Sequence, residues 1–292
     1  DSMNHHLSAP KYYGKIGGFP FIPISPWPAP GLMHVLYTQA MILSNGVVCQ
    51  VISCFFGVVT MLAVFALTSR YFGYVAGLIS AVIFYSLPIT TDLSTGAMVE
   101  LGAAFCIVLS LWALLKAGPK FETRWVILSG IIGGCAGATK LWALMGGPAF
   151  VAIIFVLAGR RFFDHPWYLF RTLFIFSVSF GLILAPWFIR NYLASGNPIW
   201  PLGFNIFETQ YYSEHTALKF SQWRRGPGTS LLHYILGPWN LTNNLTAFNA
   251  GYGIFTSYLL NPLLLAFIPS AYLFRNKFDL IVNSEKKRII ST

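Results

Sequence analysis

The chain has 292 residues, of which 55% are hydrophobic and only 10% are charged, and its mean hydropathy is +0.62. A soluble domain carries roughly a quarter charged residues, so this composition excludes an ordinary soluble globular protein. The formal net charge of +10 does not indicate nucleic-acid binding, because no basic stripe with interleaved aromatic side chains is present. In a membrane protein the excess of Lys and Arg sets the orientation instead.

The N-terminal part is expected to lie at a membrane face. Residues 1–30 are rich in Pro, Gly, Tyr and His and have no helical period, so they are predicted to form a structured loop. Residues 31–44 are apolar but too few to span a bilayer, which predicts an interfacial or partly buried helix. The dipeptide Asn45-Gly46 ends that helix. Because residue 1 is Asp, we expect further sequence, including a span, to precede it.

Long apolar stretches predict a polytopic bundle of about seven spans. The candidate spans are 47–68, 71–89, 98–116, 125–140, 142–158, 169–189 and 253–274. Glycines give the stretch 125–140 a small face suited to close helix packing. The run Gly146-Gly147-Pro148 is expected to kink the helix over 142–158.

The expected organisation has four parts. They are an external loop with an interfacial helix (1–46), a transmembrane bundle of six spans (47–189), a long external loop (190–252), and a last span with a basic cytoplasmic tail (253–292). A connection as long as 190–252 is typical of a functional, partly helical segment. The fold class is therefore an all-α membrane protein, a helical bundle whose external first loop bears juxtamembrane helices.

The positive charges predict the orientation of this bundle. With residues 1–30 outside, twelve Lys and Arg side chains fall on the inside and seven on the outside. Most of the seven lie in long loops, which count little. Residues 1–30 and the long loop therefore share the non-cytoplasmic face.

Ionisable side chains gather at that external face, and such groups at a membrane need a reason. They are Asp1, His5, His6, Asp92, Glu100, Lys140, Arg190, Glu208, Glu214, His215, Arg224 and Arg225. Cations beside carboxylates suit one task well, since the cations hold a phosphate while a carboxylate accepts a proton from an attacking hydroxyl. Two plainer interpretations stay open: Lys140 and Arg190 anchor the chain at the interface, and Asp92 and Glu100 cap the first turn of a span.

The order of motifs resembles the bacterial GT-C glycosyltransferases. These are integral-membrane relatives of the protein O-mannosyltransferases and of the aminoarabinose transferase that acts on lipid A. The motifs that carry the resemblance are DSMNHHLSAPK (1–11), MVEL (98–101), GCAGATK (134–140), APWFIRNYLASGNP (185–198) with Pro201, and GPWNLT (237–242) followed by Gly251 and Asn261-Pro262. The third is similar to the family's Gly-x-Ala-x-x-Thr-Lys turn, and the fourth is the nearest match.

The resemblance implies a polyprenyl-phosphate-linked sugar as donor, membrane lipids as surroundings, and sugar transfer with inversion on the outer face of the bacterial inner membrane. It implies that Asp1 is the general base, that Lys140 binds the donor phosphate with help from Arg190, Arg224 or Arg225, and that Glu100 supports the site. Asp92, His5 and His6 are expected to play supporting roles. No cofactor is expected. Some members use a divalent metal, but no ligand cluster in the sequence argues for one, and His5 and His6 are expected to orient the loop.

Two other classes of function remain as alternatives. One is a catalytically inactive accessory or scaffold subunit of a larger membrane complex, in which other membrane subunits would be partners. The other is a transporter or flippase of lipid-linked substrates. Transporters place charged groups at mid-membrane on broken helices, whereas the ionisable groups here gather at one face, which disfavours the transporter.

Overall fold

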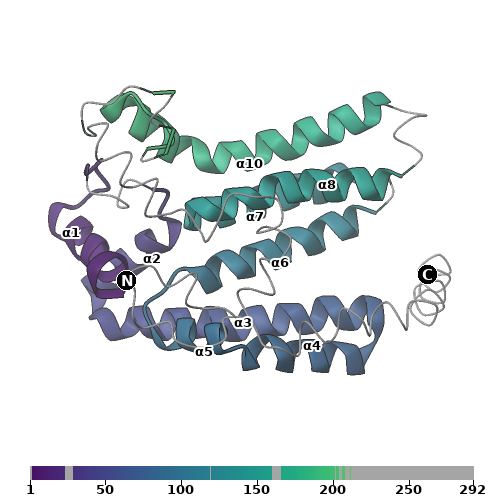
Figure 1. Cartoon of the computed structure of the whole chain (residues 1–292), viewed down its shortest axis with the longest axis horizontal. Coiled ribbons are helices and arrows are strands. Elements are labelled where there is room, and N and C mark those ends of the chain that lie inside the picture. Colours follow the sequence, from purple (N-terminus) through teal and green to yellow (C-terminus); the bar gives the residue numbers. More distant parts are fainter. Residues whose placement is uncertain are drawn as a thin grey trace, which may run out of the picture. The chain divides into compact units, whose positions relative to one another are not determined.

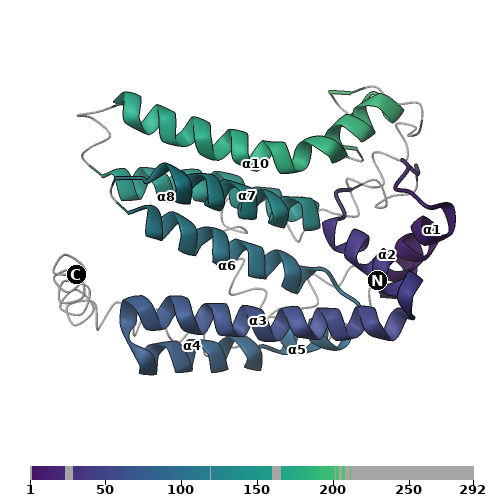
Figure 2. The ribbon, with the colours of Figure 1, turned by 180° about the vertical axis from the view of Figure 1, so that it is seen from behind.

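A computed structural model describes residues 2–23, 29–118, 120–159, 166–200, 202–203, 206–207 and 211. Within these ranges all regular structure is helical. The described residues fall into two units, one within residues 1–63 and 93–212 and the other within residues 64–92. The first unit holds most of the described helices, shown in Figures 1 and 2.

The N-terminal segment is helical where the sequence predicted a loop. A π-helix, η1 (Ser2–Leu7), runs into the helix α1 (Ser8–Ile16), and α1 packs against α2 (Leu32–Leu43). Gly17 ends α1 with a positive φ of 68°, a conformation that glycine adopts without steric cost. The helix α1 has only nine residues, too few to show a helical period in the sequence. The prediction of a short apolar helix over 31–44 is confirmed.

The first long helix is α3 (Gly46–Phe72). It begins where the sequence predicted a break, because the Asn45 side-chain oxygen accepts a hydrogen bond from the Val47 backbone N–H at 2.9 Å. The predicted span 71–89 is a bent pair instead: α4 (Tyr74–Ser86) and α5 (Pro88–Thr95) meet at 63°. A proline has no N–H to donate and suits the first turn of a new helix, which explains the break before α5.

Three helices form a tightly packed layer in the first unit. The helix α7 (Thr123–Thr139) lies between α6 (Glu100–Ala117) and α10 (Pro166–Ser195), as Figures 1 and 2 show from opposite sides. A Cβ added at Gly130 or Gly134 would lie 2.6 Å from the Ser179 Cβ or the Phe180 carbonyl oxygen of α10. The predicted small face of this helix is therefore confirmed, and it lets two backbones approach closely.

The predicted helix over 142–158 is divided in two. A 3₁₀ turn, η2 (Leu141–Met145), precedes α8 (Gly146–Ala158). The Gly-Gly-Pro run does not kink a helix but opens one, because proline fits the first turn, where its missing N–H costs nothing.

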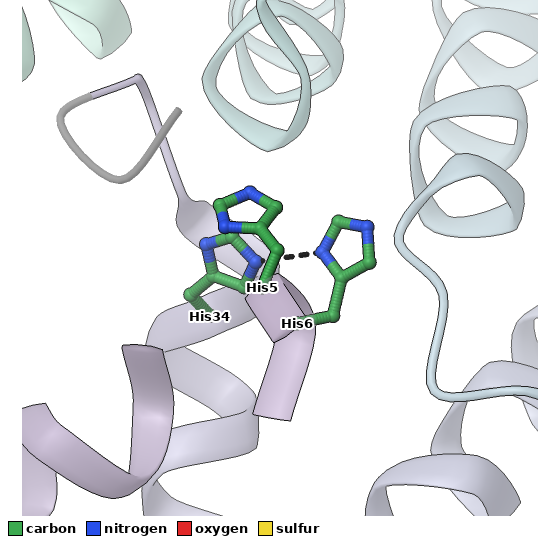
Figure 3. Close-up of side chains that lie close together, drawn as sticks. All are labelled: His5, His6 and His34. Atoms are coloured by element: carbon green, nitrogen blue, oxygen red, sulfur yellow. Dashed lines mark hydrogen bonds between the residues drawn. The ribbon is translucent and has the colours of Figure 1, made fainter. Parts of the chain in front are cut away.

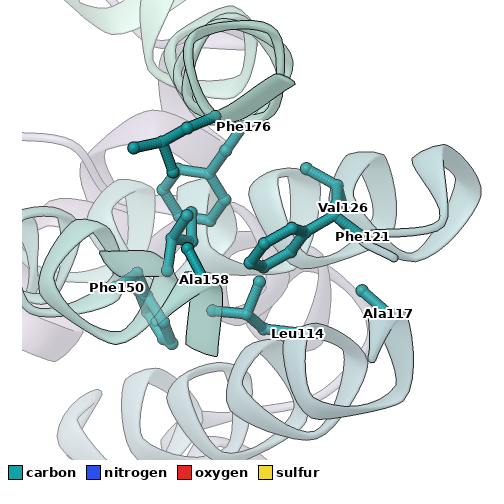
Figure 4. Close-up of a cluster of buried hydrophobic side chains, with 9 residues drawn as sticks. Leu114, Ala117, Phe121, Val126, Phe150, Ala158 and Phe176 are labelled. Carbon is teal, nitrogen blue, oxygen red and sulfur yellow. The ribbon is translucent and has the colours of Figure 1, made fainter. Parts of the chain in front are cut away.

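A hydrophobic core fills the space between α6, α7, α8 and α10. Figure 4 shows its aromatic side chains interleaved with aliphatic ones. Its buried members are Leu114, Ala117, Phe121, Val126, Phe150, Ile154, Ala158, Leu169 and Phe176.

Within the described ranges, three helices are long and apolar enough to cross a membrane: α3, α6 and α10. The bent pair α4–α5 raises the number to four if it counts as one span. The all-helical membrane class is thus confirmed, while the predicted span 253–274 and most of the loop 190–252 lie outside the described residues. The loop also starts later than predicted, since α10 continues to Ser195 before Gly196 adopts a φ of 75°.

Candidate functional site

An ion pair joins the ends of two helices in the first unit. Lys140 follows α7 directly, in an extended conformation (φ −147°, ψ 127°), and its ammonium donates a hydrogen bond to Oε1 of Glu100, the first residue of α6. The other oxygen of Glu100 accepts the Val99 backbone N–H at 3.0 Å. About a third of the Lys140 side chain (33%) and 27% of the Glu100 side chain are exposed. The pair is therefore held by protein yet reachable.

Two buried hydroxyl groups hold the turn that precedes Glu100. The Tyr37 hydroxyl of α2 donates to the Met98 carbonyl at 2.5 Å. The Ser53 hydroxyl of α3 is shared between the Leu93 carbonyl at 2.9 Å and the Met98 carbonyl at 3.1 Å. Tyr37 and Ser53 are fully buried. The N-terminus of α6, and with it the Glu100 carboxylate, is thus positioned by both α2 and α3.

Three histidines form a cluster in the same unit. His5 and His6 come from η1 and His34 comes from α2, and Figure 3 shows their rings turned toward one another. Nδ1 of His6 and Nε2 of His34 share a hydrogen bond of 2.9 Å, and the His5 ring centroid lies 4.6 Å from that of His6 and 4.9 Å from that of His34. One nitrogen of each ring can be chosen so that all three lie within 4.8 Å of one another. We call these residues the histidine cluster.

Burial keeps these imidazoles neutral. Burial, followed by the charge of Lys140, lowers the pKa of His5 to about 4, and the charge of Glu100 opposes this. Burial also lowers the pKa of His6 to about 3, with further lowering by His5 and Lys140. Burial, then His5 and His6, lowers the pKa of His34. These shifts place the Glu100–Lys140 pair within electrostatic reach of the histidine cluster.

Arg190, near the end of α10, lies against the N-terminal segment. Its Nη1 is 3.5 Å from the Phe19 carbonyl oxygen, and its Nε and Nη2 donate to the Asn191 side chain at 3.2 and 2.9 Å. Its guanidinium carbon lies 5.1 Å from the centroid of the Trp187 ring. The arginine therefore connects the last turns of α10 to the chain that follows α1.

Among the residues singled out from the sequence, the structure pairs Glu100 with Lys140 and places His5 and His6 in the histidine cluster, and the charges of that pair act on the pKa of His5. Asp92 is exposed on α5 and belongs to the second unit. Three further candidates, Asp1, Arg224 and Arg225, lie outside the described residues.

His34 was missed by the sequence analysis, which for that reason found no ligand cluster. It lies 28 residues after His6, in a stretch interpreted only as an apolar helix. The signal that could have found it is an imidazole in an otherwise largely apolar segment, since a buried polar side chain needs a partner.

Comparison with known proteins gives one match. Neither the curated proteins nor the solved structures contain a significant match to the chain. The model of the dolichyl-phosphate-mannose-protein mannosyltransferase family matches residues 29–188, more than half of the chain, from the segment before α2 into α10. The matched region includes His34, Glu100 and Lys140. The all-helical structure with its membrane-spanning helices agrees with that match, and the chain belongs to the dolichyl-phosphate-mannose-protein mannosyltransferase family, as an integral-membrane glycosyltransferase of the GT-C type.

Proposed function

We propose that the protein transfers a sugar from a polyprenyl-phosphate donor to an acceptor hydroxyl at the non-cytoplasmic face of the membrane, with inversion at the anomeric carbon. The observation that carries this proposal is the Glu100–Lys140 pair, a reachable cation held within electrostatic reach of the N-terminal segment. The family description, which names a dolichyl-phosphate-linked mannose, supports a lipid phosphate as the donor group.

Lys140 is the proposed ligand of the donor phosphate. An ammonium is a compact point charge with three donors, and Glu100 uses one of its oxygens to hold that charge in place. The carboxylate compensates the cation when no donor is bound, which reduces the cost of keeping the lysine partly buried. Arg190 is proposed to assist from α10, together with Arg224 and Arg225 of the long loop.

Asp1 is the proposed general base. It directly precedes η1, the element that carries His5 and His6. In the proposed reaction the Asp1 carboxylate takes the proton of the acceptor hydroxyl while the hydroxyl oxygen attacks the anomeric carbon. The bond from that carbon to the phosphate oxygen breaks, and the polyprenyl phosphate leaves with the electron pair. Lys140 stabilises the negative charge on the leaving phosphate.

The distribution of positive charges supports the outer face as the site of transfer. The orientation that places twelve Lys and Arg side chains inside and seven outside puts residues 1–30 and Lys140 on the non-cytoplasmic side. The bacterial relatives that the sequence resembles point to the inner membrane, with the active face outward.

Transfer and donor binding can be measured separately in proteoliposomes. The full chain is reconstituted with polyprenyl-phosphate mannose carrying a labelled sugar and with a membrane extract of the source cell as acceptor, and binding is followed with unlabelled polyprenyl phosphate. Lys140→Gln is expected to weaken the binding of polyprenyl phosphate, because the replacement has no charge. Asp1→Asn is expected to abolish transfer and leave binding unchanged.

Arg124→Gln is the matched control. Arg124 lies at the opposite end of α7 and pairs with Glu122 at 2.8 Å, but its side chain is 76% exposed. It should change neither binding nor transfer. Polyprenyl phosphate that binds Lys140→Gln as well as the wild type would overturn the assignment of the phosphate site. Full transfer by the Asp1→Asn protein would overturn the assignment of Asp1 as the general base. A folded wild-type protein that binds the donor but never transfers sugar would favour the accessory-subunit alternative.

A further inference from the structure

We propose that the histidine cluster, His5, His6 and His34, binds one divalent transition-metal ion of the zinc class through three imidazole nitrogens, with one coordination position open. This inference does not depend on the proposed function, since metal binding can be measured without any sugar transfer.

The spacing of the rings fits such a site. A tetrahedral zinc ion with Zn–N distances of about 2.0–2.1 Å needs nitrogens about 3.4 Å apart. The candidate nitrogens of the cluster lie within 4.8 Å of one another, and His6 Nδ1 lies 2.9 Å from His34 Nε2. The remaining adjustment is about 1.5 Å or less, which small rotations of the imidazole side chains can supply.

The cluster contains an unexplained polar atom. Nδ1 of His5 is buried and has no hydrogen-bond partner among the described residues. A buried nitrogen without a partner has lost its hydrogen bonds to water and gained none in exchange. Native structures therefore rarely keep such an atom unless an ion or a water molecule binds to it. A metal ion bound to the three rings would satisfy one nitrogen of each of them.

The chemistry of the donors selects the metal. Each of the three residues offers a neutral imidazole nitrogen, the usual protein ligand for zinc, cobalt, nickel and copper, whereas magnesium and calcium prefer oxygen. Three protein ligands leave the fourth tetrahedral position to a water molecule or an anion, as in catalytic rather than structural zinc sites.

A metal ion in the histidine cluster would lie within electrostatic reach of a second cation, Lys140. Three neutral imidazoles leave the metal with its full positive charge, and the Glu100 carboxylate and the Lys140 ammonium lie within electrostatic reach. An anionic group at the open position would be attracted by both the metal ion and the Lys140 ammonium. The chemical class that suits this pair of cations is an oxyanion such as a phosphate.

A cobalt titration tests the proposal directly. The full chain is purified in detergent with a tag that contains no histidine, stripped with a chelator, and titrated with Co²⁺ while visible absorption is recorded. We expect one Co²⁺ per chain, with the intense visible bands of four-coordinate cobalt, and displacement of those bands by one equivalent of Zn²⁺. Elemental analysis of the protein before stripping gives an independent measure of the metal bound.

Two kinds of variant complete the test. His5→Ala and His34→Ala are expected to lose the cobalt bands. Thr38→Val is the matched control, because the Thr38 hydroxyl touches only the His34 backbone in this cluster, donating to its carbonyl at 2.7 Å, so this variant should bind Co²⁺ as the wild type does. His165→Ala is a second control. It removes a histidine outside the cluster and should leave Co²⁺ binding unchanged. A wild-type protein that takes up less than a stoichiometric amount of Co²⁺, or bands that persist in both cluster variants, would overturn the proposal. The wild-type titration decides the matter even where a variant fails to fold.

Discussion

Lys140 is the first residue after α7 and Glu100 is the first residue of α6, and their side chains form an ion pair across 40 positions of sequence. Because each side chain is about two-thirds buried, neither charge is fully solvated. The same ion pair thus stabilises the two helix ends and fixes the position of Lys140, the residue proposed to bind the donor phosphate.

We expect the losses of unfolding free energy caused by Glu100→Gln and by Lys140→Gln to add up to more than the loss in the double variant. Each single change leaves one partly buried charge without its partner. The coupling energy should be of the order of 1 kcal/mol, at the upper end of the range for exposed pairs. A double-mutant cycle on the free energy of unfolding in detergent measures it.

The exposed Arg124–Glu122 pair provides the comparison for this cycle. Water solvates both of its partners, with side-chain exposures of 76% and 50%, so its coupling should be near zero. Equal coupling in the two cycles would show that the burial of Glu100 and Lys140 has no energetic consequence.

Gly134→Ala is expected to destabilise the bundle by about 1–3 kcal/mol, the usual effect of overpacking. The new Cβ would lie 2.6 Å from the Phe180 carbonyl oxygen, a backbone atom that cannot move aside without shifting α10. Gly181→Ala is the matched control within α10, because no atom lies within 4 Å of its added Cβ. This control should be neutral or slightly stabilising. Thermal unfolding in detergent compares the two, and a similar loss in both variants would contradict the packing argument.

Ser110→Ala should lower the free energy of unfolding by about 0.6 kcal/mol, the average for hydrogen bonds between membrane helices. The Ser110 hydroxyl of α6 donates to the Ser129 carbonyl of α7 at 2.8 Å, and the Ser129 hydroxyl donates back to the Ser110 carbonyl at 2.9 Å. Ser80→Ala is the control, because that hydroxyl bonds only within its own helix, to the Ala76 carbonyl. Chemical unfolding in mixed micelles would detect the difference, and no difference would mean that the bonds between the helices contribute nothing measurable.

Tyr37→Phe and Ser53→Ala should each loosen the turn before Glu100, since both hydroxyls donate to the Met98 carbonyl. The double variant should lose more stability than either single variant, because each change removes a different donor to that carbonyl, and Ser53→Ala also removes the hydrogen bond to the Leu93 carbonyl at 2.9 Å. The Val99 backbone N–H donates a hydrogen bond to the Glu100 carboxylate. The hydrogen-exchange rate of this amide therefore reports whether the turn stays closed. Protection of that amide in the double variant would contradict the anchoring role. Thr38→Val, next to Tyr37 on α2, is a suitable control.

The helices that a membrane requires could be predicted from the sequence, because apolar length is a strong signal. The approximate positions of α3, α6 and α10 and the glycine face of α7 followed directly. The short helices did not, since η1 and α1 have too few residues to show a period, and the break between α4 and α5 depends on one proline.

The candidate site was only partly predictable for a different reason. Glu100 and Lys140 were singled out separately as ionisable groups near a membrane, but no local pattern indicates that the start of one helix meets the end of the next. His34 can be recognised as a member of the cluster only from the tertiary contact between η1 and α2, because its partners His5 and His6 are remote in sequence. Distances of this kind depend on the packing of the whole unit.

The length of α7 has a consequence for the proposed phosphate site at Lys140. Seventeen residues at 1.5 Å each extend about 25 Å, whereas the hydrocarbon layer is about 30 Å thick. A span that began at one boundary of that layer with Arg124 would therefore bring Lys140 to a point several ångströms short of the other boundary, below the level of the lipid headgroups. A water-soluble sugar nucleotide would have to leave the aqueous phase to touch it, while a substrate with an isoprenoid tail already diffuses at that depth. Under the proposed function, the shortness of this one helix would favour lipid-borne substrates before any side chain recognises them.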